Sequence, residues 1–212
     1  MVTATRSTDV ETDAWLAGVY ARSAQRHERL CPRQVLGVRT GLAAAEALGV
    51  DPRAQGRALY IFTETDGCFT DGVEAATGCS LGHRNMRLMD YGRVAIVAAH
   101  VETGAAVRVS PAAGVRETAS AYAPDEQRHY YQQLLGYQTM PDAALLLVRP
   151  VRLRVDLAAL LGRKGIRVDC DRCGEEILNG RQHLDSGRPV CQGCTGAAFY
   201  ADNGCPESSI SA

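Results

Sequence analysis

Four cysteines in the last quarter of the chain have the spacing of a metal site. They form two Cys-x2-Cys pairs, Cys170 with Cys173 and Cys191 with Cys194, on either side of residues 174–190. Zinc binds four ligands tetrahedrally, with thiolate sulfurs at about 2.3 Å, and one tight turn supplies two of them. Four thiolates leave no position open for a substrate. The pattern therefore predicts a structural zinc site, and a redox-active Cys-x-x-Cys pair is the weaker alternative.

A second set of reactive side chains lies in the first third of the chain. Cys31 precedes Pro32, a residue that favours the first turn of a helix, so we expect this thiol at a helix N-terminus, where the helix dipole favours thiolate. His27 can approach it if the preceding helix ends in a turn. Cys68 follows a predicted strand, and turns at strand ends commonly carry functional residues. We expect function at Cys31 and Cys68, and a buried packing role for Cys79.

These residues need elements to position them, and the hydrophobic periodicity predicts both helices and strands. We expect helices over residues 12–28, 32–48, 71–76 and 124–135. We expect strands over residues 58–63, 93–101, 105–109 and 144–155, the last an edge strand that contains Pro150. The pattern predicts an α+β core with a mixed or antiparallel sheet. We divide the chain into a core over residues 10–155, a linker over 156–167, a four-cysteine zinc finger over 168–196 and a disordered tail over 197–212.

The composition is ordinary for a soluble globular protein. About 46% of the 212 residues are hydrophobic, 22% are charged, and the formal net charge is −1. This balance gives no indication of nucleic-acid binding. No stretch reaches the ~20 apolar residues needed to cross a bilayer, and the first residues do not resemble a secretory signal. We therefore predict a cytoplasmic protein with no membrane partner, in which the eight cysteines stay reduced.

Three segments of the core share their order and spacing with a known family. They are His27-Glu28-Arg29-Leu30-Cys31-Pro32 with Leu36-Gly37, Glu64-Thr65-Asp66-Gly67-Cys68 with Asp71, and Thr77-Gly78-Cys79 with Gly82, Asn85 and Asp90-Tyr91-Gly92. Together they resemble the FmdE family, which takes its name from formylmethanofuran dehydrogenase. The cysteine-rich tail matches those family members that carry a C-terminal treble-clef zinc finger. The resemblance covers roughly residues 15–195.

The resemblance implies an α+β core, usually dimeric, with the finger appended. It also implies a cleft suited to metal binding, which by position contains His27, Cys31 and Cys68. The family's second histidine position is Arg29 in this chain, and arginine is not an ordinary metal ligand because it stays protonated. Arg29 is suited instead to binding a carboxylate or phosphate, or to lowering the pKa of a thiol.

Three functions compete on these residues. The first is a metal-binding protein that holds zinc or another soft or borderline ion, or a haem iron through Cys31, in the core cleft. The second is an enzyme in which Cys31 is a thiolate nucleophile or the ligand of a catalytic metal or haem, assisted by His27 and Arg29. The third is a homodimeric interaction module whose finger binds a protein partner. The other candidates for contacts in the cleft are Asp66, Asn85, Asp90 and Tyr91.

Overall fold

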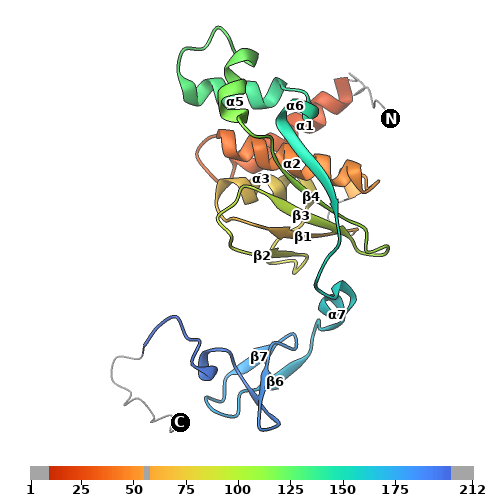
Figure 1. Cartoon of the computed structure of the whole chain (residues 1–212), viewed down its shortest axis with the longest axis vertical. Coiled ribbons are helices and arrows are strands. Elements are labelled where there is room, and N and C mark those ends of the chain that lie inside the picture. Colours follow the sequence, from red (N-terminus) through yellow and green to blue (C-terminus); the bar gives the residue numbers. More distant parts are fainter. Residues whose placement is uncertain (1–9, 55–57, 202–212) are drawn as a thin grey trace. The chain divides into compact units, whose positions relative to one another are not determined.

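The structure is a computed structural model and describes residues 10–54 and 58–201. The chain divides into two compact units, one ending at Arg154 and the other beginning at Val155 (Figure 1). Cys205 and most of the predicted tail lie outside the described residues. None of the helices that the structure describes has the length and apolar character needed to cross a membrane.

The larger unit contains a five-stranded mixed sheet, which confirms the predicted fold class. Its strands lie in the order β2-β1-β3-β4-β5, with β1 parallel to β2 and every other neighbouring pair antiparallel. They are β1 (Leu59–Thr63), β2 (Met86–Leu88), β3 (Ile96–His100), β4 (Ala106–Pro111) and β5 (Leu146–Val151). All of these strands except β2 were predicted. β2 was missed because a three-residue strand is too short to show a periodicity of its own. β5 is an edge strand, where Pro150 is tolerated because part of the strand needs no hydrogen-bond donor.

The described residues of this unit form six helices, in addition to two short 3₁₀ segments at Pro52–Ala54 and Ala119–Tyr122. They are α1 (Val10–Ala24), α2 (Pro32–Ala47), α3 (Cys68–Thr77), α4 (Val115–Thr118), α5 (His129–Thr139) and α6 (Asp142–Leu145). Helices α2 and α3 lie beside the sheet and enclose the main core with it (Figure 1). Val35 and Phe69 from the helices pack there with Ile61, Ile96 and Val109 from the strands.

Three helices differ from the prediction at their ends. The helix expected over 71–76 is α3, which begins three residues earlier, at Cys68. The first helix was expected to reach residue 28, but α1 ends at Ala24 and the chain turns before Cys31. The helix expected over 124–135 begins only at His129. Before it, the Glu126 side chain accepts from the backbone N–H of Arg128, and its carbonyl accepts from the Gln132 side chain. These local hydrogen bonds stabilise a turn in place of the helix start that the proline predicts.

Glycines bring α2 and α3 unusually close. A Cβ atom at Gly37 would overlap the carbonyl oxygen of Phe69, and one at Gly72 would overlap that of Gln34. One turn further along, a Cβ at Gly41 would lie 2.9 Å from the Cβ of Ala76. Contacts therefore progress in the same direction along both helices, so α2 and α3 are parallel and their N-termini lie at the same end.

We expect Gly37→Ala to lower the free energy of unfolding by about 3 kcal/mol, because an overpacked core site with a backbone neighbour has little room to relax. Gly18→Ala in α1 is the matched control, since the nearest atom to its added Cβ is the end of the flexible Arg22 side chain at 3.7 Å. The control should stabilise the protein by up to about 1 kcal/mol, the usual gain of alanine over glycine in a helix. Urea denaturation measures both, and equal stability of the two variants would contradict the close packing.

The second unit is small and consists mainly of two hairpins. It begins with α7 (Leu157–Gly162), which lies in the segment predicted as a linker and is capped by the Asp156 carboxylate. The remaining elements are β6 (Arg167–Asp169) paired with β7 (Glu176–Leu178), β8 (His183–Asp185) paired with β9 (Arg188–Val190), and a 3₁₀ turn at Gly193–Thr195. Its buried apolar cluster contains Cys170, Ile177 and Val190. So few buried residues provide little stability of their own.

Candidate functional site

Cys31 is the N-cap of α2, as predicted. Its Sγ accepts a hydrogen bond from the backbone N–H of Gln34 at 3.4 Å, and Gln34 Oε1 accepts from the backbone N–H of Cys31 at 2.9 Å. This is a capping box in which a sulfur replaces the usual hydroxyl. Gln34 Nε2 also donates to the carbonyl of Ser23 at 2.7 Å, so the same residue fixes the turn between α1 and α2.

Cys68 is the first residue of α3 and follows Gly67, whose positive φ of 75° favours glycine. Because α2 and α3 are parallel, the starts of the two helices meet, and the Cys68 thiol lies close to the Cys31 thiol. Burial raises the pKa of Cys68, and the hydrogen bond with Cys31 and the charge of Asp71 raise it further. Two thiols at adjacent helix N-termini make a pair that can chelate a soft metal ion.

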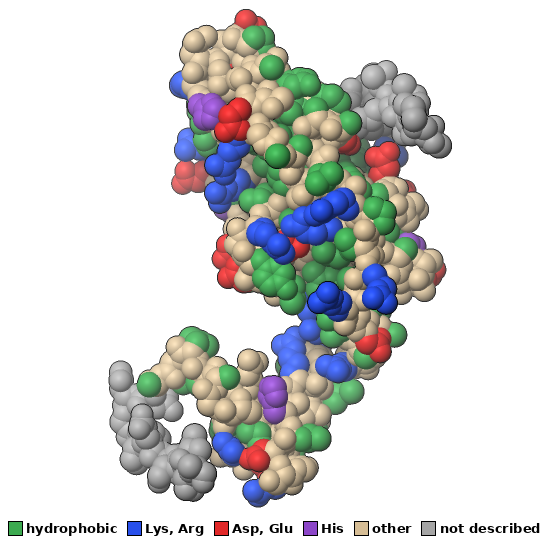
Figure 2. All heavy atoms as spheres, viewed as in Figure 1, with side chains coloured by type: hydrophobic (Ala, Val, Ile, Leu, Met, Phe, Trp, Pro, Cys, Tyr) green, Lys and Arg blue, Asp and Glu red, His purple; other side chains and the backbone are tan. Residues whose placement is uncertain are grey.

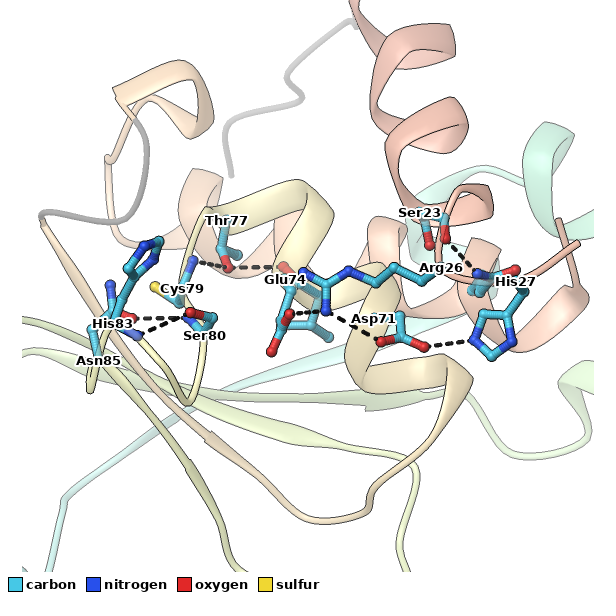
Figure 3. A network of polar contacts seen from close by, with 12 residues as sticks. Ser23, Arg26, His27, Asp71, Glu74, Thr77, Cys79, Ser80, His83 and Asn85 are labelled. Carbon is cyan, nitrogen blue, oxygen red and sulfur yellow. Dashed lines mark hydrogen bonds and ion pairs between the residues drawn. The ribbon is translucent and has the colours of Figure 1, made fainter. Parts of the chain in front are cut away.

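The turn after α1 brings His27 to α3 rather than directly to Cys31. His27 Nε2 lies 2.7 Å from Asp71 Oδ2, and Asp71 also pairs with Arg26 at 3.5 Å (Figure 3). Arg26 extends from there to Glu74. When a carboxylate holds one ring nitrogen of a histidine, the other nitrogen is oriented for binding a metal. Asp71 is therefore a member of the site that the sequence showed only as part of a motif.

Tyr130 is a further neighbour of the thiol pair that was not predicted. Burial raises the pKa of its phenol, the charges of Cys31 and Cys68 raise it too, and the charge of Arg29 lowers it. Tyr130 therefore lies near both thiols and near Arg29. Tyr130 lies on α5, about a hundred residues after Cys31, and no pattern in the sequence predicts that the two are close.

The remaining predicted cleft residues make other contacts. Asn85 Oδ1 accepts from the backbone N–H of Ser80 at 2.9 Å and shapes the loop before β2 (Figure 3). The guanidinium of Arg93 lies over the Tyr91 ring, 4.8 Å from its centre. Asp66 and Asp90 are exposed. In the part of the chain that the structure describes, Asp66, Asp90 and Tyr91 are not hydrogen-bond or ion-pair partners of the thiol pair.

Cys79 has the environment expected of a packing residue. Its side chain is fully buried, and its Sγ donates to the Leu59 carbonyl at 3.5 Å. Burial raises the pKa of the Cys79 thiol to about 11, so it is protonated at neutral pH. A protonated, inaccessible thiol is neither a nucleophile nor a metal ligand.

A buried carboxylate at the end of β1 was also missed. Glu64 accepts two hydrogen bonds from Arg108, both 2.8 Å long, and pairs with Arg93 at 2.8 Å. The hydrogen bonds from Arg108 hold the pKa of Glu64 below its ordinary value. In the sequence, Glu64 is only the first residue of a polar turn, and Arg108 lies 44 residues away.

The four cysteines of the second unit converge on one point, as the spacing predicted. Their sulfur atoms lie within 4.8 Å of one another, and the sulfurs of Cys173 and Cys191 are 3.9 Å apart. A tetrahedron with metal–sulfur bonds of about 2.3 Å has edges of about 3.8 Å. The group can therefore hold a metal ion. Among the described residues it is the only group of three or more His, Cys, Asp or Glu side chains with such spacing.

Backbone groups favour the thiolate form of Cys170, whereas the neighbouring thiols raise the pKa of Cys173 and Cys194. The N–H of Cys191 lies 3.2 Å from Cys170 Sγ, and that of Cys194 lies 3.4 Å from Cys191 Sγ. The hydrogen bond from Cys191 is the main cause that lowers the pKa of Cys170 to about 6. The side chain of Arg172 donates to the carbonyl of Cys194 and joins the two Cys-x2-Cys turns.

Comparison with known sequences identifies the larger unit. The sequence model described as "FmdE, Molybdenum formylmethanofuran dehydrogenase operon" matches residues 26–146, more than half of the chain. The chain belongs to the FmdE family. The match includes Cys31, Cys68 and strands β1 to β4, and it ends at Leu146, the first residue of β5. The four-cysteine group lies outside it.

Two relatives of this FmdE-family chain show how far the likeness extends. A "Probable S-adenosyl-L-methionine-binding protein" of Archaeoglobus fulgidus is 35% identical over 97 residues, which are 44% of this chain and 26% of that protein. The chain thus spans about a quarter of that relative's length. The crystal structure of a "tungsten formylmethanofuran dehydrogenase subunit e (fmde)-like protein" from Syntrophus aciditrophicus matches with a TM-score of 0.56 and 18% sequence identity. The match covers 88% of this chain and 95% of that one, and this likeness shows the fold.

Proposed function

We propose that the core of this FmdE-family protein binds a soft or borderline metal ion through Cys31 and Cys68. The observation that supports this most is the proximity of the two thiols at the starts of two parallel helices. The positive ends of both helix dipoles would stabilise the two sulfurs as thiolates once a bound ion has displaced their protons. Thiolate ligands select ions such as zinc, Fe²⁺ or Cu⁺ over Mg²⁺ or Ca²⁺.

His27 is the third ligand in this proposal. Its Nε2 is held by Asp71, which orients the ring and leaves Nδ1 as the coordinating atom. In the conformation described, His27, Cys31 and Cys68 do not form a closed ligand group. His27 is 38% exposed and lies in a turn, so binding of the ion would close the site by a movement of this turn. Arg29, in place of a second histidine, leaves the fourth position to solvent or to another molecule.

The ion in the four-cysteine group is proposed to be zinc, and the module a structural finger of the treble-clef type. The sulfur spacing and the two hairpins support this, and four thiolates form a closed zinc site. Nothing among the described residues favours haem at Cys31. Four predictions remain untested: an enzymatic role for Cys31, a homodimer, a protein partner for the finger and a cytoplasmic location. The seven cysteines among the described residues are free thiols, which is in keeping with a cytoplasmic location.

The test is the metal content of the full chain purified without added metal. We expect two equivalents per chain in the wild type and one in Cys31→Ser or Cys68→Ser, because serine caps a helix as well as cysteine but is not a soft ligand. Cys79→Ala is the matched control and should retain two equivalents, because Cys79 packs in the core. One equivalent in the wild type and in all three variants would overturn the core site and leave only the finger.

A further inference from the structure

A cavity of about 350 Å³ opens beside the start of α2, and its lining is rich in arginine. It lies at the end of the sheet where β4 ends and the chain approaches β3, and α5 forms another wall. This volume falls in the range of small-molecule sites. The arginines that line it are Arg33, Arg93, Arg108 and Arg116.

The charges of this lining are not balanced. Glu64 binds both Arg93 and Arg108, so one carboxylate serves two guanidinium groups. Arg33 and Arg116 form no ion pair with any carboxylate within residues 10–54 and 58–201. The lining therefore carries an excess of positive charge. On the face of the larger unit shown in Figure 2, basic side chains gather next to apolar ones.

The remaining lining is partly apolar and partly neutral. Aliphatic side chains from α2, α4 and the approach to β3 share the wall with Tyr137, and Ser110 and Gln133 add neutral polar groups. Guanidinium groups match the paired oxygens of carboxylates and phosphates and donate two parallel hydrogen bonds to them. An apolar wall beside such donors suits an organic anion better than a bare inorganic ion.

We propose that this cavity binds a small organic anion with at least two negative charges, carried by carboxylate or phosphate groups. Arg33 and Arg116 provide the unpaired charges that hold the anion. Arg93 and Arg108 are positioned by Glu64 and extend the basic lining. The site is separate from metal binding at Cys31 and Cys68 and does not depend on it, although Arg33 is only two residues from Cys31.

The test is isothermal titration of the full chain with two probes, pyrophosphate and citrate, at low salt. We expect saturable binding of at least one probe, weakened about tenfold or more by Arg33→Gln and by Arg116→Gln, since each substitution removes a charge-assisted contact. Arg53→Gln is the matched control, because Arg53 is exposed and lies over the Trp15 ring outside the cavity. It should change the dissociation constant less than about twofold.

The two probes also distinguish the ligand's chemistry. Tighter binding of pyrophosphate indicates a phosphate ligand, and tighter binding of citrate indicates a carboxylate ligand. Saturable binding that Arg33→Gln and Arg116→Gln leave unchanged, or no saturable binding of either probe, overturns the proposal. Both arginines are exposed, so the variants should keep the wild-type thermal midpoint. Metal content measured on the same variants should equal that of the wild type, which separates this proposal from the core metal site.

Discussion

Replacing Arg39 with methionine is expected to lower the free energy of unfolding of the larger unit by about 3–5 kcal/mol. The Arg39 side chain is 1% exposed and lies between α2 and the end of α5. It pairs with Asp142 and donates to the backbone carbonyls of Tyr137, Gln138 and Met140. Methionine would leave this carboxylate and these carbonyls without their donor, and unsatisfied buried acceptors are costly.

The carbonyls involved are those at the C-terminal end of α5, which lack partners within the helix itself. Arg39→Lys is expected to recover only part of the loss, because one ammonium group cannot reproduce the planar fork of the guanidinium. Arg33→Met, on the exposed side of the same helix, is the matched control and should change stability by less than about 0.5 kcal/mol. Trp15, the single tryptophan of the chain, packs in the larger unit and reports its urea denaturation.

A denaturation midpoint of Arg39→Met close to that of the control would contradict this account of α5. The loss should also reach the candidate site, since α5 carries Tyr130 next to the thiol pair. A typical domain is stable by only about 5–15 kcal/mol, so a loss of this size leaves little margin at physiological temperature.

The helix starts of the core were visible in the sequence where a local signal exists. Pro32 marks the first turn of α2, and Gly49, with φ 67°, follows its end. These two residues set the bounds of the helix and placed Cys31 correctly. Pro124 is also a residue that favours the first turn of a helix, but here it begins a turn. The Glu126 and Gln132 side chains form hydrogen bonds with backbone groups that a helix would need.

The meeting of Cys31 and Cys68 could not be derived in the same way. It depends on the parallel packing of α2 and α3 across Gly37 and Gly72, residues that helix propensity alone marks as unfavourable. In the sequence, only the family resemblance groups the two cysteines. The position of Tyr130 could not be predicted either, because tertiary packing and not a local sequence pattern brings it close to the thiols.

The four-cysteine group shows the opposite case, because its chemistry is local. Each Cys-x2-Cys turn fixes two sulfurs by geometry, and one segment between the turns suffices to bring them together. Spacing alone therefore predicted the group. The same locality means that the second unit has little else to stabilise it, since its buried cluster is formed by three residues.

Removal of the metal is accordingly expected to unfold the second unit while the larger unit stays folded. Structural zinc sites in small fingers contribute apparent binding free energies of about 10–16 kcal/mol, far more than three buried side chains supply. In hydrogen exchange on the full chain, we expect a chelator or Cys173→Ser to remove amide protection from both hairpins, β6–β7 and β8–β9. Trp15 fluorescence should show the same urea midpoint for the larger unit with and without metal in the second unit.

Cys31→Ser is the matched control for this experiment, because it removes a cysteine from the core and leaves the four sulfurs of the second unit in place. Its hairpins should keep their protection until the chelator is added. Hairpins that remain protected after complete removal of the metal would show that the apolar cluster around Ile177 holds the unit together without an ion. If metal-bound thiolates order the second unit, its stability should also decline at acidic pH, where protons compete with the metal for the sulfurs.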